Sequence, residues 1–292
     1  MQIQFIDRET GQLKTEKPPG EGFLKLLYNN PFGKMLFIPL VKRKFLSSIY
    51  GRLMNKPASI NKIRTFVKEL NINMEEAERP IEDYVSFNDF FSRKLKKGVR
   101  TIKEGLISPG DGKLLAFEKI DKLENFFIKG RKFHLTEFLS DKKLASKFKD
   151  GSLLILRLAP DDYHRYHFPF DGTPSKIKKI KGNYLSVSPY ALVNNFTKVF
   201  CENKREYCIL KTPSNGDILI APVGATMVGS IIETYTANTN IKKGDEMGYF
   251  EFGGSTIVLL TEKNRFSINE DILKNTLNKR ETYVKMGDQI AN

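Results

Sequence analysis

The chain has 292 residues, of which 40% are hydrophobic and 11% aromatic; this excludes a disordered chain and allows a sizeable core. Lys and Arg outnumber Asp and Glu by 48 to 34, and the net charge of +14 favours nucleic acid, an anionic membrane or an acidic substrate as partner. The polar stretch 1–15 shows no signal peptide. The apolar run 35–41 is far shorter than the roughly 18–20 residues of a membrane span.

Residues 21–56 combine bulky apolar side chains with seven basic residues and a single acidic one, Glu21. Three of the basic residues, Lys42, Arg43 and Lys44, are consecutive. This composition suits helices that lie in the headgroup layer of an anionic bilayer, and it equally suits helices that pack on a core with a solvated basic face. Proline at position 39 excludes one straight helix.

Periodicity predicts a helix over 60–70, and a Ser-x-x-Asp capping pattern predicts a second helix that starts at Ser86. Short apolar runs after about residue 105 predict strands, with short helical inserts at 135–139 and 190–193. The predicted strands are 151–158, 207–211, 217–223, 227–232, 249–252 and 255–260. We therefore expect an α+β fold, with a helical N-terminal region over 1–104 and a compact, mostly antiparallel β core over 105–292.

The chain contains only three histidines, and His164 and His167 fall within the single stretch 160–169. Imidazole suits proton transfer near neutral pH, so the pair is a candidate for acid–base chemistry. A metal site would need a third ligand, which this stretch does not supply, and a purely structural role stays open. The two cysteines, Cys201 and Cys208, match no zinc spacing and suggest reduced thiols in a cytosolic compartment.

Two glycine-containing fragments are ambiguous when each is read alone. Asp111 lies between two glycines in the stretch 108–112, which is either a plain turn or a turn whose carboxylate orients an imidazole. Gly254-Ser255 follows another glycine and precedes a strand-forming run. A serine there can attack the preceding carbonyl if a base takes its proton, and the alternative is a glycine bulge entering a strand.

Taken together and in order, these fragments resemble the phosphatidylserine decarboxylase family between about residues 84 and 260. The stretches that carry the resemblance are 90–95 (Phe-Phe-Ser-Arg-Lys-Leu), 108–112, 129–130, 158–160, 162–165 (Asp-Tyr-His-Arg), 167, 184–187, 223–225, 228–229 and 252–256 (Phe-Gly-Gly-Ser-Thr). The resemblance implies that Ser255 is a self-cleavage serine, that His167 is its base and that Asp111 holds that base. It also implies that His164 handles substrate and transfers protons.

The resemblance further implies a proenzyme that cuts itself between Gly254 and Ser255 and converts Ser255 into a covalent pyruvoyl group. Chains 1–254 and 255–292 would stay together as a heterodimer, and higher oligomers are compatible with this. Through a Schiff base to the pyruvoyl group, the enzyme would convert phosphatidylserine of an anionic membrane to phosphatidylethanolamine and CO₂.

A lipid substrate favours membrane docking by residues 21–56, through Lys42, Arg43 and Lys44, and a peripheral position on the cytoplasmic face of the cell membrane. No metal and no nucleic acid is expected. Two alternatives remain: a pyruvoyl decarboxylase of a soluble amino acid, and a non-enzymatic biotinyl- or lipoyl-like barrel built around 241–245.

Overall fold

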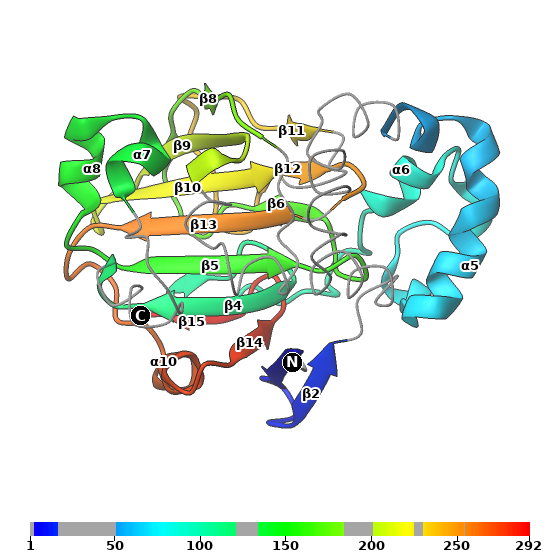
Figure 1. The fold of residues 1–292 in the computed structure, drawn as a ribbon, viewed down its shortest axis with the longest axis horizontal. Coiled ribbons are helices and arrows are strands. Elements are labelled where there is room, and N and C mark those ends of the chain that lie inside the picture. Colours follow the sequence, from blue (N-terminus) through cyan, green and yellow to red (C-terminus); the bar gives the residue numbers. More distant parts are fainter. Residues whose placement is uncertain (1–2, 17–50, 121–133, 184–200, 225–229, 254) are drawn as a thin grey trace, which may run out of the picture.

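A ten-stranded, mostly antiparallel sheet forms the centre of the computed structural model (Figure 1), which describes residues 3–16, 51–120, 134–183, 201–224, 230–253 and 255–292. In sheet order its strands are β2 (Leu13–Glu16), β1 (Ile3–Asp7), β14 (Glu281–Val284), β4 (Gly112–Phe117), β5 (Leu153–Leu158), β13 (Ser255–Thr261), β10 (Asp217–Gly224), β9 (Arg205–Lys211) and β7 (Thr173–Pro174), and β8 (Lys178–Ile180) also pairs with β9. Only the β1–β14 pair is parallel among the described strands.

Two smaller sheets complete the described β-structure. One joins β11 (Ile231–Glu233), β12 (Glu246–Phe250) and β6 (Arg165–His167), and the other pairs β15 (Gln289–Ala291) with β3 (Leu106–Ile107). Backbone pairing of β6 with β12 places the histidine-bearing strand beside the main sheet.

The middle of the large sheet is buried on both faces, which explains why its strands are apolar along their whole length. All residues of β5 and β13 are buried, and both strands consist largely of leucine and β-branched residues. A strand covered on both faces reads as a continuous apolar run instead of an alternating one. The predicted strands 151–158 and 255–260 are therefore confirmed, as are those at 207–211 and 217–223.

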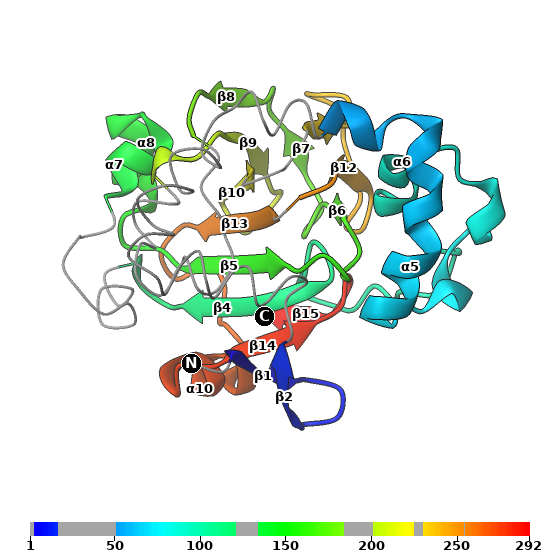
Figure 2. The same cartoon turned by 45° about the vertical axis from the view of Figure 1, so that its right-hand side comes forward.

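Helices stand at the two ends and along one edge of the sheet (Figures 1 and 2). Their bounds are α5 (Asn61–Leu70), α6 (Phe87–Phe91), α7 (Leu135–Leu139), α8 (Lys142–Phe148) and α10 (Glu270–Leu277), with 3-10 turns at Pro57–Ile60, Met74–Glu76 and Ile81–Asp83. The ends where β5 finishes and β13 begins face α5 and α6 in both views. None of the described helices is long and apolar enough to cross a membrane.

Helix α6 begins at the predicted cap. The Ser86 hydroxyl accepts a hydrogen bond from the Asp89 amide at 3.1 Å, and the Asp89 carboxylate accepts one from the Val85 amide, also at 3.1 Å. These bonds satisfy amides that the first turn leaves unpaired. The helix then buries an apolar cluster separate from the main core, made of Met54, Ile63, Tyr84, Phe87, Phe90 and Phe91, with Phe252 packed against it. The helical expectations for 60–70, 86 onward and 135–139 are confirmed.

The first described residues differ from the helical N-terminal region that the sequence suggests. Residues 3–16 form the β1–β2 hairpin, and β1 pairs in parallel with β14, near the opposite end of the chain. The hairpin is held by Arg157, which forms ion pairs with Glu16 at 2.5 Å and with Glu281 at 2.6 Å. Such a long-range partnership leaves no local periodic pattern, so it could not be read from 3–16 alone. The segment 17–50, including Lys42, Arg43 and Lys44, and the predicted insert at 190–193 lie outside the described residues.

Candidate active site

Ser255 is the first residue of β13 and lies in the middle of the sheet. It pairs with Leu158 of β5 on one side and with Gly224 of β10 on the other. Its side chain is fully buried, and its hydroxyl has no hydrogen-bond partner in the part of the chain that the structure describes. Gly253, two residues earlier, has φ +146°, a backbone conformation that glycine tolerates far better than other residues. Gly254, the other half of the predicted cleavage site, lies outside the described residues.

The backbone that leads to Ser255 is held by one buried amide side chain from α6. The Asn88 side-chain oxygen accepts a hydrogen bond from the Phe252 backbone amide at 2.9 Å. The Asn88 side-chain nitrogen donates to the carbonyl of Gly51 at 3.3 Å and to the side chain of Asn55 at 2.9 Å. The last residues of the predicted docking region 21–56 and the segment that precedes Ser255 therefore meet on the same residue.

His164 is fully buried next to this junction. Its Nδ1 lies 2.9 Å from the carbonyl oxygen of Asp162, and because a carbonyl only accepts, Nδ1 carries the proton. Its Nε2 has no hydrogen-bond partner and therefore presents a free lone pair. Burial lowers the pKa of His164 to about 3, against a weaker opposing effect of the Asp162 carbonyl. The Phe91 ring covers the imidazole, with ring centroids 3.9 Å apart.

An ion pair supports the turn that orients His164. The Asp162 carboxylate lies 2.9 Å from Lys113 Nζ and also accepts the Ala159 amide at 2.7 Å, and both side chains of the ion pair are almost fully buried. Burial raises the pKa of Asp162 to about 7, although the nearby Lys113 ammonium acts in the opposite direction. Lys113 is on β4 and Asp162 follows β5, so the pair ties two neighbouring strands of the sheet together.

His167, at the end of β6, has partners at both ring nitrogens. Nδ1 donates to the Gly244 carbonyl at 2.9 Å, and Nε2 lies 3.1 Å from the Tyr163 hydroxyl. Because the carbonyl accepts, Nε2 is the acceptor of the Tyr163 O–H. Burial lowers the pKa of His167, so the ring is neutral near pH 7. This is the tautomer that a general base needs, and its basic nitrogen is engaged by Tyr163.

Asp111 is held by other partners. Its carboxylate forms two hydrogen bonds with the Arg100 guanidinium, at 2.6 and 3.1 Å, and a third with the Met286 amide at 2.8 Å. Arg100 also contacts Glu76 at 2.7 Å, and these carboxylates raise the pKa of Arg100 although burial opposes them. The Asp111 carboxylate is thus held by three hydrogen bonds, none of which comes from His167.

The fold brings the segments that carry the three residues of the predicted triad to one turn. The His167 amide donates to the Pro109 carbonyl at 2.7 Å, which fixes β6 against the turn that carries Asp111. A Cβ added at Gly110 would lie 3.6 Å from the carbonyl oxygen of Arg165 and 3.8 Å from Ile257 Cδ1, so the turn sits between β6 and β13. No hydrogen bond links Asp111, His167 and Ser255 to one another among the described residues. Their joint action as a triad stays a prediction.

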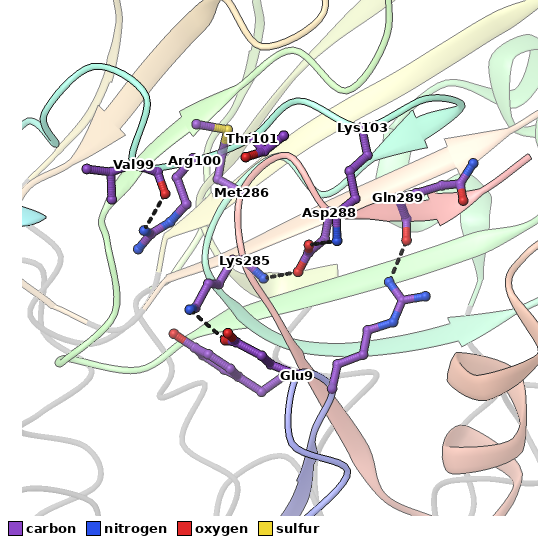
Figure 3. Close-up of a pocket in the computed structure, with 11 residues that line it drawn as sticks. Glu9, Val99, Arg100, Thr101, Lys103, Lys285, Met286, Asp288 and Gln289 are labelled. Carbon is purple, nitrogen blue, oxygen red and sulfur yellow. Dashed lines mark hydrogen bonds and ion pairs between the residues drawn. The ribbon is translucent and has the colours of Figure 1, made fainter.

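Two cavities lie near Asp111, and Asp111 itself lines the smaller of them. The larger, of about 450 Å³, lies between the loop after β1 and the turn between β14 and β15, where Lys285 pairs with Glu9 at 2.8 Å and Lys103 with Asp288 at 2.6 Å (Figure 3). The smaller, of about 210 Å³, is lined by residues that include Asp111, Tyr163 and Arg93. Arg100, Tyr283 and Lys285 line both cavities, whereas Ser255 and His164 line neither.

Sequence reasoning missed the partners of the predicted residues more than the residues themselves. Tyr163 and Asp162 stand in the same quoted stretch as His164, and Arg93 stands in the stretch 90–95, but none of them received a role. The signal that could have found them is the chemistry of their side chains, because a phenol, a carboxylate and a guanidinium are strong hydrogen-bonding groups. Arg100 lay outside every quoted stretch and only the fold reveals it.

The cysteines are free thiols in the described structure. Cys208 is fully buried and Cys201 is half-buried, and burial raises their pKa values to about 12 and about 11. Thiols with such high pKa values are protonated near pH 7 and are poor nucleophiles. Neither carries chemistry at this site.

Comparisons with known proteins agree with the resemblance. A family model described as phosphatidylserine decarboxylase matches residues 87–292. The chain is 57% identical to a phosphatidylserine decarboxylase proenzyme of Fusobacterium nucleatum subsp. nucleatum, over 99% of this chain and 97% of that protein. It is 47% identical to the proenzyme of Clostridium tetani and 45% identical to that of Desulfitobacterium hafniense, each over 99% of this chain and 98% of the relative. The non-enzymatic barrel alternative is thereby removed, and the chain belongs to the phosphatidylserine decarboxylase family.

Proposed function

We propose that this chain is a self-cleaving decarboxylase that converts phosphatidylserine to phosphatidylethanolamine and CO₂ with a pyruvoyl group made from Ser255. One observation carries the self-cleavage: the Ser255 hydroxyl is buried and has no hydrogen-bond partner among the described residues, and Ser255 lies two residues after Gly253, whose φ is +146°. A buried hydroxyl without a hydrogen bond is costly in a structural role. A reactive role explains why the fold keeps it.

The cut proceeds by rearrangement of one peptide bond. Ser255 Oγ loses its proton and attacks the Gly254 carbonyl, and the amide becomes an ester with a free amine on residue 255. Elimination breaks the ester, releasing the Gly254 carboxylate and leaving dehydroalanine at position 255. Addition of water to its imine form releases ammonia and leaves a ketone at the start of the chain 255–292.

His167 is the proposed base and Asp111 the carboxylate that orients it. Both assignments require an exchange of partners. His167 Nε2 must leave the Tyr163 hydroxyl to accept the Ser255 proton, and Asp111 must leave Arg100 to reach the imidazole. The Gly244 carbonyl already holds the His167 tautomer with its basic nitrogen at Nε2, so the base is prepared before the exchange.

The residues around Ser255 fit a ketone at this position. A pyruvoyl group at position 255 would supply an electrophilic carbonyl for the substrate amine and an electron sink for the loss of CO₂. His164 Nε2, which has no hydrogen-bond partner among the described residues, would relay a proton to the carbon that loses CO₂. The Phe91 ring and the apolar cluster around α6 would exclude water from this carbon.

We also propose that the two chains, 1–254 and 255–292, remain together as a heterodimer at the membrane. Lys42, Arg43 and Lys44 would dock the enzyme peripherally on the anionic cytoplasmic face, each contributing on the order of 1 kcal/mol near such a surface. Replacing all three with glutamate is expected to weaken binding to anionic vesicles in a sedimentation assay. Unchanged binding would contradict their role in docking.

The intact mass of the purified protein tests the proposal directly. Wild type should give two chains that separate at 254/255, with the smaller chain blocked to N-terminal sequencing, and Ser255→Ala should stay whole. Ser152→Ala is the matched control, because Ser152 also follows a glycine and is buried in the sheet, yet bonds to the Glu118 carbonyl. A wild type that stays whole while folded, or a preparation that decarboxylates free serine and not the lipid, would contradict the proposal.

A further inference from the structure

Arg93 is a buried guanidinium that forms no ion pair with any of the described residues. Arg93 lies two residues after the end of α6, and only 5% of the residue is exposed. One terminal nitrogen, Nη2, makes two long contacts with the carbonyls of Asp161 and Asp162, at 3.3 and 3.5 Å. The other, Nη1, is buried and has no hydrogen-bond partner. Burying a charge is costly unless it is paired and hydrogen-bonded, so this cation lacks one anion.

The carboxylates near Arg93 are already paired with other cations. Asp162 pairs with Lys113 at 2.9 Å, and Asp111 pairs with Arg100 at 2.6 Å. Asp161 has an exposed side chain and forms no ion pair with Arg93. No carboxylate among the described residues therefore pairs directly with the guanidinium. Burial lowers the pKa of Arg93, and the more distant Asp111 and Asp162 only partly oppose this effect.

The position of Arg93 connects it with the proposed reaction centre. The carbonyl oxygen of Asp162 accepts both from Arg93 Nη2, at 3.5 Å, and from His164 Nδ1, at 2.9 Å, so the guanidinium and the imidazole meet on one atom. Arg93 also lines the cavity of about 210 Å³ with Tyr163. That volume is several times the roughly 30 Å³ share of one water molecule, which leaves room for a small anionic group.

We propose that Arg93 binds the phosphodiester of phosphatidylserine, an assignment that rests on the proposed function. The substrate carries two anionic groups, and only one of them suits a fixed cation. A cation on the carboxylate that leaves as CO₂ would stabilise the substrate more than the transition state and slow the reaction. The phosphodiester keeps its charge throughout, and a guanidinium matches the oxygens of a phosphate group.

The test compares two short-chain, soluble substrates: phosphatidylserine and its methyl phosphotriester, which keeps the serine group and loses the phosphate charge. Arg93→Gln should lower kcat/KM for the diester about 10- to 100-fold, through a higher KM, because a charge-assisted hydrogen bond is lost. It should leave kcat/KM for the triester unchanged. Arg93→Lys should restore part of the preference for the diester.

Lys94→Gln is the matched control, because it removes the same charge from the exposed neighbouring residue and should leave both substrates unaffected. The thermal midpoint of Arg93→Gln should equal or exceed that of wild type, since no ion pair is lost. Intact mass separates the two proposals: Arg93→Gln should still split into two chains, because the cut uses no lipid. Equal losses on both substrates, or none on the diester, would overturn the assignment of Arg93 while the split of wild type stands.

Discussion

His164 and His167 lie three residues apart, and the two places they occupy in the fold are built differently. The ring nitrogens of His167 and the carboxylate of Asp111 have partners: Gly244 holds Nδ1 of His167, Tyr163 holds its Nε2, and Arg100 holds Asp111. In contrast, His164 Nε2, Ser255 Oγ and Arg93 Nη1 are all buried without a hydrogen-bond partner among the described residues.

The difference fits the proposed roles of the two histidines, with His167 in self-cleavage and His164 in turnover. A site whose partners must be exchanged before it can act is suited to an event that happens once, such as self-cleavage. A site that keeps lone pairs and donors free is prepared for a ligand that comes and goes with each turnover. The following predictions break or sharpen this comparison, beginning with the largest expected effect.

Separate replacement of the two histidines should block different steps. His167→Gln should slow self-cleavage by about 10²- to 10⁴-fold, the usual contribution of general acid–base catalysis. His164→Gln should split normally and lose turnover on phosphatidylserine by a similar factor. The measurements are a time course of chain splitting by mass spectrometry and an assay of CO₂ release. If both variants slow the same step, the division of work proposed here is wrong.

The His164 region should depend on its buried ion pair. Lys113→Met leaves the Asp162 carboxyl buried without its cation and should lower the free energy of unfolding by about 3–5 kcal/mol. The double variant Lys113→Met, Asp162→Asn should recover part of that loss, because the second change removes the uncompensated group. Denaturant unfolding in the uncut Ser255→Ala background measures both. A single variant as stable as its parent would show that Asp162 does not need Lys113.

Acid should destabilise the fold through its neutral histidines. Burial lowers the pKa of His164 to about 3 and also lowers that of His167, so the folded state binds fewer protons than the unfolded state below the ordinary histidine pKa of about 6.5. This stability is present above pH 6.5 and is lost as the pH falls toward 3, at up to about 1.4 kcal/mol per pH unit for each histidine.

The raised pKa of Asp162 acts with the opposite sign, because there the folded state binds more protons between about pH 4 and 7. The informative quantity is therefore the difference between variants in the Ser255→Ala background. His164→Gln should flatten the dependence of stability on pH, and replacement of the exposed His134 by glutamine should leave it unchanged. An equal slope in parent and His164→Gln would contradict a neutral buried His164.

Removal of the Tyr163 hydroxyl should have the smallest effect. Tyr163→Phe deletes one hydrogen bond to His167 Nε2 and should cost about 0.5–1.5 kcal/mol of stability. Self-cleavage should be unchanged or faster, because the proposed base no longer has to give up a partner. Slower cleavage at preserved stability would make Tyr163 part of the machinery instead of a competitor for Nε2.

Local patterns predicted much of this fold because they depend on neighbours in sequence. The helix over 60–70, the cap at Ser86 and the apolar strands on either side of Ser255 all follow from periodicity or short-range hydrogen bonding. The hairpin of residues 3–16 could not be predicted in this way, because its position depends on β14 and on Arg157.

The candidate site shows the same limit at a finer scale. A motif identifies Asp111, His167 and Ser255, and the fold brings their segments to one turn. The motif does not say that Arg100 binds Asp111 or that Tyr163 binds His167, because those contacts depend on side-chain directions set by packing between distant strands. Composition also does not reveal that Arg93 lacks an anionic partner among the described residues, because a count of charges does not say which side chains form ion pairs.

The place of β13 in the sheet determines the order in which folding and self-cleavage would have to occur. The chain 255–292 contains β13, which joins β5 to β10, and β14, which joins β4 to the N-terminal hairpin. A cut before Ser255 would divide the polypeptide and leave the sheet whole, so the fragments would be separable only by unfolding. Folding would have to precede maturation. Unfolding of the mature protein would then be close to irreversible. Two separate polypeptides would have to meet in solution and rebuild a sheet that was first assembled from one chain.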